Sequence, residues 1–480
     1  MSNVRVALIY SSLGRYALMI VGLINTVVVA RLLSPEEIGT FAIASSVVMI
    51  MAEFRILGAN TYLIREKELT KDKIMSAYGL TLLISWGLGV FVVVAAMPAS
   101  KFFNIPDLTN IFFILSVSFI FAPYISIPNA LLSREYKFKE ITIIRLCSSL
   151  TNISTTVLFI LNGFSYYSLA FGNLSSVLVQ FSLYMYFTRS VKVYRPRFAD
   201  IKPIAKLGIF MSFSHVVRRA HFTIPDMIIG KVGGPGQVGI FSRGLGFMVF
   251  VSDALLSGIS PVALPYLSDV RKRNESMVKA YTRAAQLIVG VVWPVLAVAS
   301  VASLPAIRLM FGDQWDSSAP IASVLAFWAM LRASHVLAPQ ALVAVGKEGA
   351  MLLKEIVVLL FFLMLIFSVY PKWGLLGVGY AFIFSGFIDF LVSSYFMKLK
   401  VELEFFVYLR SLFSSVVVAA SCWMSTYLIS CVFPYDTTAP IFSLLQISIV
   451  LPVVWISTIF ITKHPIKNEI IRLYKIKFGN

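Results

Sequence analysis

The sequence predicts an all-α polytopic protein that crosses a membrane about fourteen times. Its 480 residues are 58% hydrophobic and only 13% charged, with a mean hydropathy of +0.85, whereas soluble domains carry roughly twice that charged fraction. Apolar stretches of about 20 residues, the length that crosses a bilayer as a helix, recur from one end of the sequence to the other. One short motif also occurs twice. These observations exclude a single water-soluble core and predict a membrane protein built from two related halves.

The apolar stretches form two groups of six and a final pair. The first group is expected near residues 10–30, 39–60, 76–98, 109–132, 141–161 and 165–187. The second group is expected near residues 207–230, 238–260, 282–303, 319–345, 351–370 and 374–397. The final pair is expected near residues 410–432 and 440–462. The first stretch lacks the small-residue cleavage site of a signal peptide, so we expect it to be retained as a span.

The repeated motif predicts two homologous lobes. Residues Arg31–Phe41 read RLLSPEEIGTF and residues Lys231–Phe241 read KVGGPGQVGIF, and further along Glu53 matches Asp253 in the same register. Each copy joins the first and second spans of its group. Parallel repeats around an axis along the membrane normal are a transporter architecture, with the substrate site between the repeats. We therefore expect six-helix lobes at residues 1–200 and 201–400, and an additional helix pair with a basic tail at 401–480.

Basic residues between the spans predict the orientation, because Lys and Arg near span ends are retained on the cytoplasmic side. Of the 41 basic residues, 28 fall on one side of the expected topology. They are Arg5 and the basic residues of 65–73, 134–139, 189–206, 271–279, 347–354, 398–410 and 463–480. We therefore expect both termini to be cytoplasmic. The net charge of +18 is then an orientation signal and indicates no nucleic-acid partner.

Eight arginines remain within the spans or at their edges. They are Arg15, Arg55, Arg145, Arg218, Arg219, Arg243, Arg283 and Arg332. Each would cost about 2.5–3.5 kcal/mol at the bilayer centre, so each needs water, an acid or a ligand anion. The embedded acids are fewer, namely Glu53, Asp226, Asp253 and Asp389. For Arg145 and Arg283, and as an alternative for Arg15, snorkelling from a span end to the interface is the simpler explanation.

Four segments resemble the Wzx-type oligosaccharide flippases. They are ARLLSPEEIGTFAIASS at Ala30–Ser46, LLSREYKFKEI at Leu131–Ile141, IPDMIIGKVGGPGQVGIFSRG at Ile224–Gly244 and ALPYLSDV at Ala263–Val270. The resemblance extends over nearly the whole chain and is to the colanic-acid exporter-like group of the polysaccharide transporter family, within the multidrug/oligosaccharidyl-lipid/polysaccharide superfamily. Gly236 and Gln237 depart from the family by replacing the acid that often follows the second proline, which bears on loop capping alone.

The resemblance implies a V-shaped pair of six-helix lobes and transport by alternating access. The implied cargo is an undecaprenyl-pyrophosphate-linked oligosaccharide, moved from the cytoplasmic to the outer leaflet of a bacterial cytoplasmic (inner) membrane. Such a flippase would serve exopolysaccharide, capsule or O-antigen (lipopolysaccharide) assembly. The implied partners are the lipid-linked oligosaccharide, membrane lipids, and a polymerase or other glycan-assembly proteins.

The resemblance also places the first two helices of each lobe around a central cavity. The arginines on those helices are expected to bind pyrophosphate, because a guanidinium binds phosphate oxygens through two aligned donors. They are Arg15, Arg55, Arg218, Arg219 and Arg243. The polar residues expected to line the cavity, with a possible role in ion coupling, are His215, Asp226, Glu53 and Asp253.

Polar residues on the seventh expected span predict one wetted face. Ser212, His215, Arg219 and Asp226 share a helical face in an otherwise apolar stretch, and Pro225 predicts a kink next to Asp226. Two alternatives remain open. Arg219 and Asp226 would form a static pair with each other or with neighbouring helices, since embedded charges find partners. His215 would be an interior hydrogen-bonded residue rather than a proton sensor.

Two other functions were weighed against the flippase. A cation-coupled drug exporter of the same superfamily would need acids in its cavity, whereas arginine is in excess here. A membrane glycan polymerase or ligase would need a long external loop, and the longest one expected, about 304–318, is short and offers only Asp313 and Asp316 as acids. We therefore expect a transporter and no enzyme. The four histidines and three cysteines have no metal-ligand spacing, so no metal or cofactor is expected.

Overall fold

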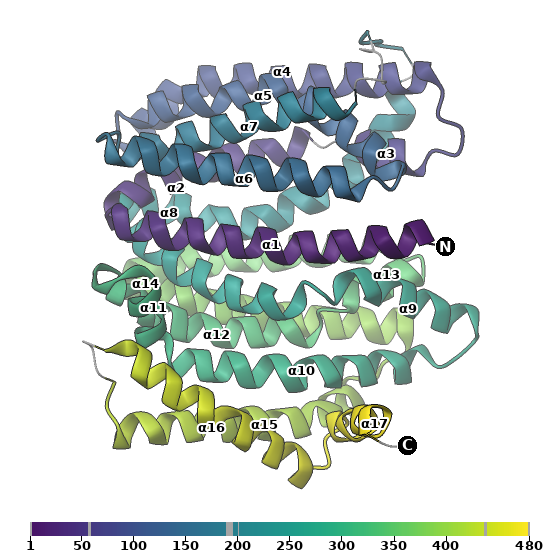
Figure 1. Ribbon diagram of the computed structural model, residues 1–480, viewed down its shortest axis with the longest axis vertical. Coiled ribbons are helices and arrows are strands. Elements are labelled where there is room, and N and C mark those ends of the chain that lie inside the picture. The colour runs from purple at the N-terminus through teal and green to yellow at the C-terminus, as the bar shows by residue number, and fades with distance from the viewer. Residues whose placement is uncertain (1, 56–58, 189–194, 200, 436–438, 479–480) are drawn as a thin grey trace. The chain divides into compact units, whose positions relative to one another are not determined.

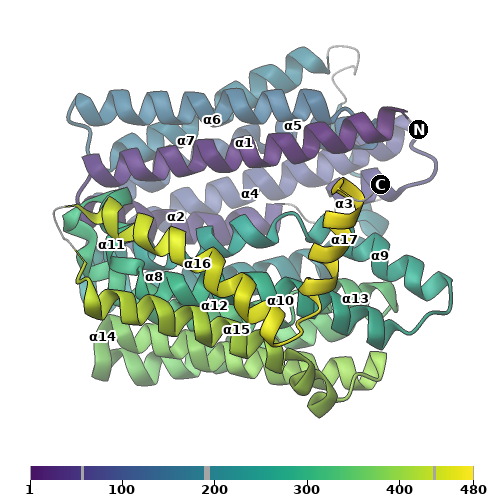
Figure 2. The ribbon, with the colours of Figure 1, turned by 60° about the horizontal axis from the view of Figure 1, so that its bottom comes forward.

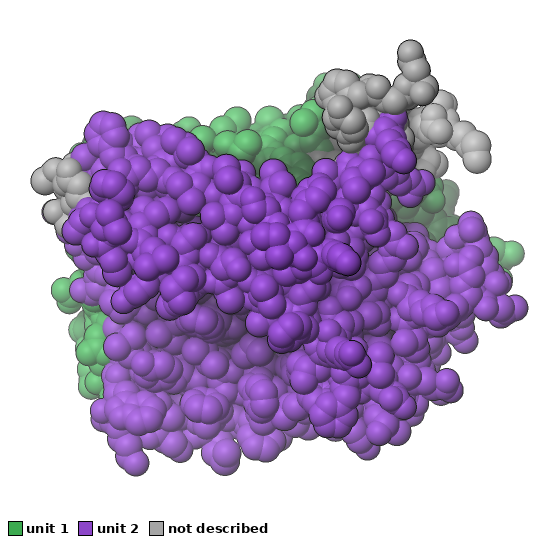
Figure 3. Space-filling view, turned by 90° about the horizontal axis from the view of Figure 1, so that it is seen from below, with its two compact units in different colours: residues 1–242 green, residues 243–480 purple. Residues whose placement is uncertain are grey.

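The computed structural model describes residues 2–55, 59–188, 195–199, 201–435 and 439–478. Within these residues the regular structure is helical, with seventeen α-helices and one 3-10 helix, which confirms the all-α fold class. The chain divides into two compact units, Met1–Ser242 and Arg243–Asn480 (Figure 3). The division lies inside α8 (Ile201–Leu256), whereas the repeat predicts a lobe boundary at residue 200. The expected lobe limits therefore stay a prediction.

The first unit contains the first seven helices and the beginning of α8. The seven are α1 (Ser2–Leu32), α2 (Pro35–Arg55), α3 (Ala59–Arg65), α4 (Lys71–Phe103), α5 (Leu108–Arg134), α6 (Phe138–Leu161) and α7 (Tyr167–Phe187). Helix α4 packs along α5, α5 along α7, and α7 along α6, while α1 also packs against α6 (Figure 1). A Cβ at Gly14 would lie only 2.5 Å from Thr142, so glycine allows α1 to approach α6 closely.

The two copies of the repeated motif touch each other within the first unit. A Cβ on Gly39 would lie 1.7 Å from the carbonyl oxygen of Pro235, and a Cβ on Gly239 would lie 1.9 Å from the carbonyl oxygen of Pro35. Each copy therefore brings its glycine against the proline carbonyl of the other copy. Small residues permit this backbone-to-backbone approach between membrane helices. The contact gives a physical reason for the glycine that both copies share.

Two long helices are interrupted by a glycine with a positive φ, which other residues adopt only with strain. In α8 the break is at Gly234 (φ 80°, ψ 174°), and in α14 (Glu348–Val401) it is at Gly374 (φ 57°, ψ −142°). Each of these helices contains two of the expected spans. The backbone is helical at Pro225, and the kink expected there stays a prediction.

The second unit contains the rest of α8 and all later elements. They are α9 (Ser260–Lys272), α10 (Met277–Val301), α11 (Ser303–Phe311), the 3-10 helix η1 (Asp313–Ser318), α12 (Ala319–Ser334), α13 (Ala338–Ala344), α14, α15 (Phe405–Val432), α16 (Pro440–Ile461) and α17 (Ile466–Phe478). Helix α10 packs against both α12 and α15, α12 packs against α14, and α15 packs against α16 (Figure 2). A turn after α16 leads into α17, which runs in a different direction.

Eleven helical segments within the described residues are long and apolar enough to cross a membrane. The segments His215–Leu256 and Gly349–Val401 each hold two expected spans on either side of a glycine break, and the sixth expected span coincides with α7. Every expected span therefore overlaps a helix of the structure. The exact number of crossings stays a prediction.

One expected loop is folded. The stretch 304–318 forms α11 and η1, with Trp315 fully buried and Arg308 paired with Asp316. Burial of the indole, together with the ion pair, fixes this segment against the helices of the second unit. It offers no extended external loop of the kind that a polymerase or ligase needs.

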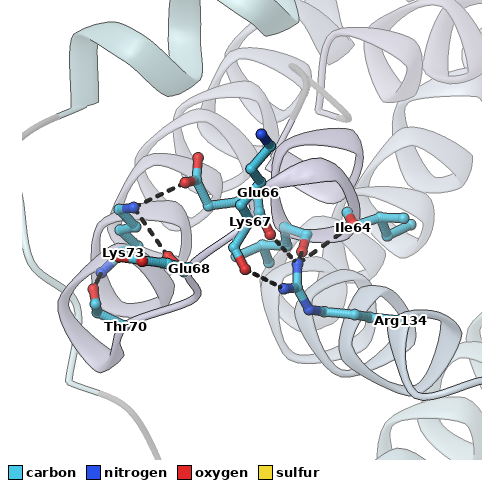
Figure 4. Close-up of polar contacts among 8 residues, drawn as sticks. Ile64, Glu66, Lys67, Glu68, Thr70, Lys73 and Arg134 are labelled. Carbon is cyan, nitrogen blue, oxygen red and sulfur yellow. Dashed lines mark hydrogen bonds and ion pairs between the residues drawn. The ribbon is translucent and has the colours of Figure 1, made fainter.

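The end of α3 is held by a single arginine of α5. Arg134 donates from Nη1 to the carbonyl oxygens of Leu63 (2.7 Å) and Glu66 (2.5 Å), and from Nη2 to that of Lys67 (3.2 Å) (Figure 4). These are carbonyls that lack partners at a helix end. The Glu66 carboxylate accepts from Lys73 at 2.9 Å, and this hydrogen bond lowers the pKa of Glu66 below its usual value. Arg134, expected only as an orientation signal, is therefore also a capping residue.

Candidate functional site

The structure brings four of the expected site residues together on α2 and α8. Glu53 lies near the end of α2, and its Oε1 is 3.5 Å from Nε of Arg219 on α8. The pair is loose, because Arg219 Nε is buried and makes no hydrogen bond in the described part of the chain. The Arg219 side chain is 42% exposed and the Glu53 side chain 20%. The pair therefore combines charge attraction with access for another ligand.

His215 and Arg218 complete this group on the same turns of α8. Arg218 Nη2 lies 3.0 Å from His215 Nδ1, and both residues are exposed. A guanidinium can only donate, so Nδ1 is the acceptor and the ring proton is on Nε2. Glu53 also lies close enough to His215 to interact with it electrostatically. Glu53, His215, Arg218 and Arg219 are called the α2–α8 cluster below; it holds two guanidinium groups and one carboxylate.

Asp226 belongs to a separate contact. Its Oδ1 accepts a hydrogen bond of 2.7 Å from the Ser242 hydroxyl. The two residues lie on opposite sides of the Gly234 break in α8, so the hydrogen bond joins the two segments of that helix. The acid that pairs with Arg219 is Glu53 of α2. This agrees with the alternative in which Arg219 finds its partner on a neighbouring helix.

In the second unit, Arg243 is held by aromatic rings. Its Cζ lies 4.9 Å from the ring centroid of Trp315 and 5.1 Å from that of Phe311. Arg243 Nε is buried and makes no hydrogen bond within the described residues. Cation–π contacts of this kind hold the guanidinium without using its in-plane donors. Asp253 is exposed and lies within electrostatic range of Arg332 on α12.

The two remaining expected pyrophosphate ligands are Arg15 and Arg55. Arg15 lies half-buried on α1, next to the glycine that contacts α6. The Arg55 side chain, like that of Ser212, lies outside the described part of the structure. The two arginines interpreted as snorkelling are both exposed: Arg145 forms a hydrogen bond with Tyr184, and Arg283 forms an ion pair of 2.8 Å with Glu469.

The sequence matches a known family over most of its length. A model of the family described as "Polysaccharide biosynthesis protein" matches residues 28–320, which is more than half of the chain. The chain belongs to this polysaccharide biosynthesis protein family. The match includes both copies of the repeated motif and the whole α2–α8 cluster. The cluster therefore lies within the region of this polysaccharide biosynthesis protein that matches the family model.

Curated relatives of this polysaccharide biosynthesis protein come from several bacteria. Lipopolysaccharide biosynthesis protein WzxC of Escherichia coli (strain K12) is 22% identical over 335 residues, covering 67% of this chain and 66% of WzxC. An "uncharacterized membrane protein in cps region" of Klebsiella pneumoniae is 22% identical over 474 residues, covering 97% and 96%. Succinoglycan biosynthesis transport protein ExoT of Rhizobium meliloti (strain 1021) is 24% identical over 304 residues, covering 62% and 60%. The match thus spans just under two thirds of the lengths of WzxC and ExoT.

Solved structures with the same fold are membrane transporters. The inward closed conformation of the lipid II flippase MurJ superposes with a TM-score of 0.76 at 17% identity, covering 94% of this chain and 98% of MurJ. An inward-facing multidrug transporter of the MATE family superposes with a TM-score of 0.64 at 17% identity, covering 80% and 96%. At these identities the likeness shows the fold. The expectation of a polytopic transporter fold is confirmed.

Sequence reasoning missed a buried charge group in this polysaccharide biosynthesis protein. Lys354 was counted with the basic residues of 347–354 as an orientation signal, but it lies in α14 with its side chain 11% exposed. Its Nζ is 2.8 Å from Oδ1 of Asp389 and 3.3 Å from Oε1 of Glu355. The available signal was Asp389, an acid inside an apolar stretch, which requires a cation nearby.

A second buried network joins four helices of the same unit. His335 Nδ1 lies 2.8 Å from the Tyr281 hydroxyl, and His335 Nε2 lies 2.8 Å from the Ser394 hydroxyl. Tyr408 stacks on the imidazole and donates to the carbonyl of Ser334. These groups satisfy one another, as buried polar groups must. The network could not be predicted from local sequence patterns, because its members are far apart along the chain.

Proposed function

We propose that this chain is a flippase that carries an undecaprenyl-pyrophosphate-linked oligosaccharide from the cytoplasmic to the outer leaflet by alternating access. Family membership supports a role in polysaccharide biosynthesis, and ExoT, by its name a transport protein, supports transport. The fold shared with the lipid II flippase supports a lipid-linked cargo. Both termini are proposed to be cytoplasmic, in a bacterial inner membrane, on the distribution of basic residues.

The α2–α8 cluster is the observation that carries the proposal. One guanidinium lies beside the Glu53 carboxylate and the other beside His215, within segments that are otherwise apolar, so the cluster has an excess positive charge. A diphosphate offers oxygen pairs that match the two parallel donors of a guanidinium, with shorter and better aligned bonds than the 3.5 Å pair of Arg219 with Glu53. A pyrophosphate that displaces Glu53 from Arg219 would therefore gain aligned hydrogen bonds.

The tautomer of His215 adds a third donor to the same place. Because Nδ1 accepts from Arg218, the Nε2–H group remains as a donor for a phosphate or sugar oxygen. Glu53 then has a defined role, since it holds Arg219 when no anion is bound and repels the released anion afterwards. This exchange needs no metal ion or cofactor in the cluster.

The test is glycan export by cells that depend on this chain, measured against the amount of protein in the membrane. Arg219→Ala is expected to reduce export by about tenfold or more, since a charge-assisted hydrogen bond contributes about 1.5–3 kcal/mol. Arg219→Lys should restore export only in part, because an ammonium cannot bind phosphate through two parallel donors.

Arg410→Ala is the matched control, since Arg410 is an exposed arginine of α15 outside the cluster. It is expected to export normally. Export by Arg219→Ala at the level of Arg410→Ala, with equal protein in the membrane, would contradict the assignment of the cluster. A lysine variant as active as wild type would contradict the bidentate mode of binding.

A further inference from the structure

A basic pocket lies in the second unit, whereas the α2–α8 cluster belongs to the first. Its cavity has a volume of about 510 Å³ and is lined by residues of α10, α15, and the turn and helix that follow α16. Three of its lining residues are cations, namely Lys279, Arg283 and Lys463, and none of the described lining residues is a carboxylate. Cavities of about 300–1,000 Å³ accommodate small ligands. The pocket therefore has the size and charge for an anionic group larger than a single ion.

The walls of the pocket are fixed by packing and hydrogen bonds. Lys279, Arg283 and Gln286 recur at the spacing of one face of α10, and Gln286 Nε2 donates to the carbonyl of Ser411 at 2.7 Å. Between the lining residues Lys463 and Pro465, fully buried His464 lies 2.9 Å from the Ser415 hydroxyl through Nε2. These contacts hold together the helices that carry the pocket, whereas its cations are exposed.

The cations of the pocket have donors that can bind a ligand. Arg283 uses Nη2 for its ion pair with Glu469, at 2.8 Å. Lys279 and Lys463 are exposed and carry the remaining positive charge. Thr282 also lines the cavity, but its hydroxyl oxygen is buried. The guanidinium and the two ammonium groups are donors that suit phosphate oxygens.

The surroundings of the pocket identify a lipid rather than a soluble anion. Phe406, next to the lining residue Val407, is 79% exposed, and Ile461, two residues before Lys463, is also 79% exposed. Large apolar side chains with this exposure in a membrane protein face acyl chains. The pocket thus lies where the apolar surface meets the charged end of the helices, which is the depth of lipid headgroups.

Helix α17 packs apolar residues on the second unit and exposes basic ones. Ile466 is buried and Ile470 packs in the same apolar cluster with Leu287 and Val418, while the exposed residues Arg472 and Lys475 carry positive charge. Exposed basic residues near a membrane are attracted by anionic lipids. The distribution of basic residues places this end of the chain at the cytoplasmic leaflet, where anionic lipids attract them.

We propose that the pocket formed by α10, α15 and α17 binds the phosphate headgroup of an anionic phospholipid in the cytoplasmic leaflet. The phosphate contacts Lys279, Arg283 and Lys463, and the acyl chains lie along the exposed apolar surface beside Phe406. The site shares no residue with the proposed cargo site and serves a resident lipid. Bound lipid joins α17 to α10 and α15, so it stabilises the end of the second unit.

The experiment measures binding of fluorescent phosphatidylglycerol to the full-length protein in detergent at constant ionic strength, with fluorescent phosphatidylcholine as the neutral lipid. The variant Lys279→Ala with Lys463→Ala removes two pocket cations. The matched control, Lys398→Ala with Lys400→Ala, removes two exposed lysines from the end of α14. Since a basic residue near the surface contributes about fivefold in affinity, the pocket variant is expected to bind phosphatidylglycerol about 10- to 30-fold more weakly. The control should change less than about threefold, the part left by screening of exposed charges.

A variant with unchanged net charge distinguishes binding in the pocket from general attraction to the positive charge of the protein. Thr282→Phe fills the cavity without changing the charge and is expected to weaken phosphatidylglycerol binding while the protein stays monodisperse. Equal losses in the pocket and control variants, or equal binding of the two lipids, would overturn the proposal. Displacement of phosphatidylglycerol by millimolar inorganic phosphate at constant ionic strength would also overturn it, because the pocket would then be a site for free phosphate.

Discussion

Replacing Gly39 by alanine is expected to force apart the two copies of the repeated motif. The added methyl carbon would lie 1.7 Å from the Pro235 carbonyl oxygen, 2.6 Å from its carbon and 2.9 Å from the Gly239 nitrogen. All three atoms belong to backbone, so no side chain can rotate away. An ordinary contact begins near 3.4 Å, so the helix starts must separate by about 1.7 Å.

The cost follows from the packing around this contact. Ile43, Val238 and Phe241 are fully buried beside it, and a Cβ at Gly230 would already lie 2.7 Å from Ile43. A shift of this size therefore opens a well-packed region. Overpacking costs about 1–3 kcal/mol. Because this clash is between two backbones, we expect a cost in the upper part of that range, about 2–3 kcal/mol. The midpoint of thermal denaturation should fall by about 5 °C or more.

The assay is the fraction of purified protein that remains monodisperse after heating. Gly246→Ala is the matched control, because Gly246 is an exposed residue of α8 with open space at its Cβ position. Alanine at that position should stabilise the helix by about 0.5–1 kcal/mol. The reasoning is refuted if Gly39→Ala is as heat-resistant as Gly246→Ala. Gly239→Ala should reproduce the loss, since its Cβ would meet the Pro35 carbonyl at 1.9 Å.

Lys354→Met is expected to cost about 3–5 kcal/mol, because it leaves the Asp389 carboxylate buried without its cation; adding Asp389→Asn should restore part of the heat resistance, and no difference between single and double variants would argue against the pair. Burial lowers the pKa of His464 below its usual value near 6.5, so the unfolded chain binds a proton more readily than the folded one. Heat resistance should therefore be greatest above about pH 6.5 and decline as the pH falls below it, and His464→Gln should flatten this profile; an unchanged slope would exclude His464 as its source. If the proposed cargo carries two negative charges outward, a membrane potential of 100 mV, inside negative, contributes about 4–5 kcal/mol. Flipping in proteoliposomes with a potassium gradient and valinomycin should then depend on the sign of the potential, and insensitivity at constant pH and sodium would count against it.

The repeat and the apolar spans were visible in the sequence because both are local patterns. Every expected span overlaps a helix, and the match at Gly39 and Gly239 marks a place where the two copies touch. That each glycine faces the proline of the other copy could not be predicted from either motif. That fact depends on how two helix starts meet, and neither motif contains it.

Of the features of the candidate site, the partners of the embedded charges were the hardest to predict from the sequence. Arg219 was expected near the cargo, but its pairing with Glu53 joins helices from opposite ends of the first unit's sequence. Lys354 was counted among the basic residues of 347–354 as an orientation signal, whereas α14 begins at Glu348 and buries Lys354 beside Asp389. In both cases the charge was recognisable and its partner was not, since packing between helices decides which acid comes near.

The contact between the two motifs is self-complementary, because each copy gives the other the same glycine and receives the same carbonyl. Symmetric homodimers are joined by contacts of this isologous kind. A half-length ancestor with one motif would therefore have been able to pair with a second copy of itself through this surface. Fusion of two such halves would keep the pairing and leave the flanking positions free to differ, and here Glu36 and Glu37 of one copy correspond to Gly236 and Gln237 of the other.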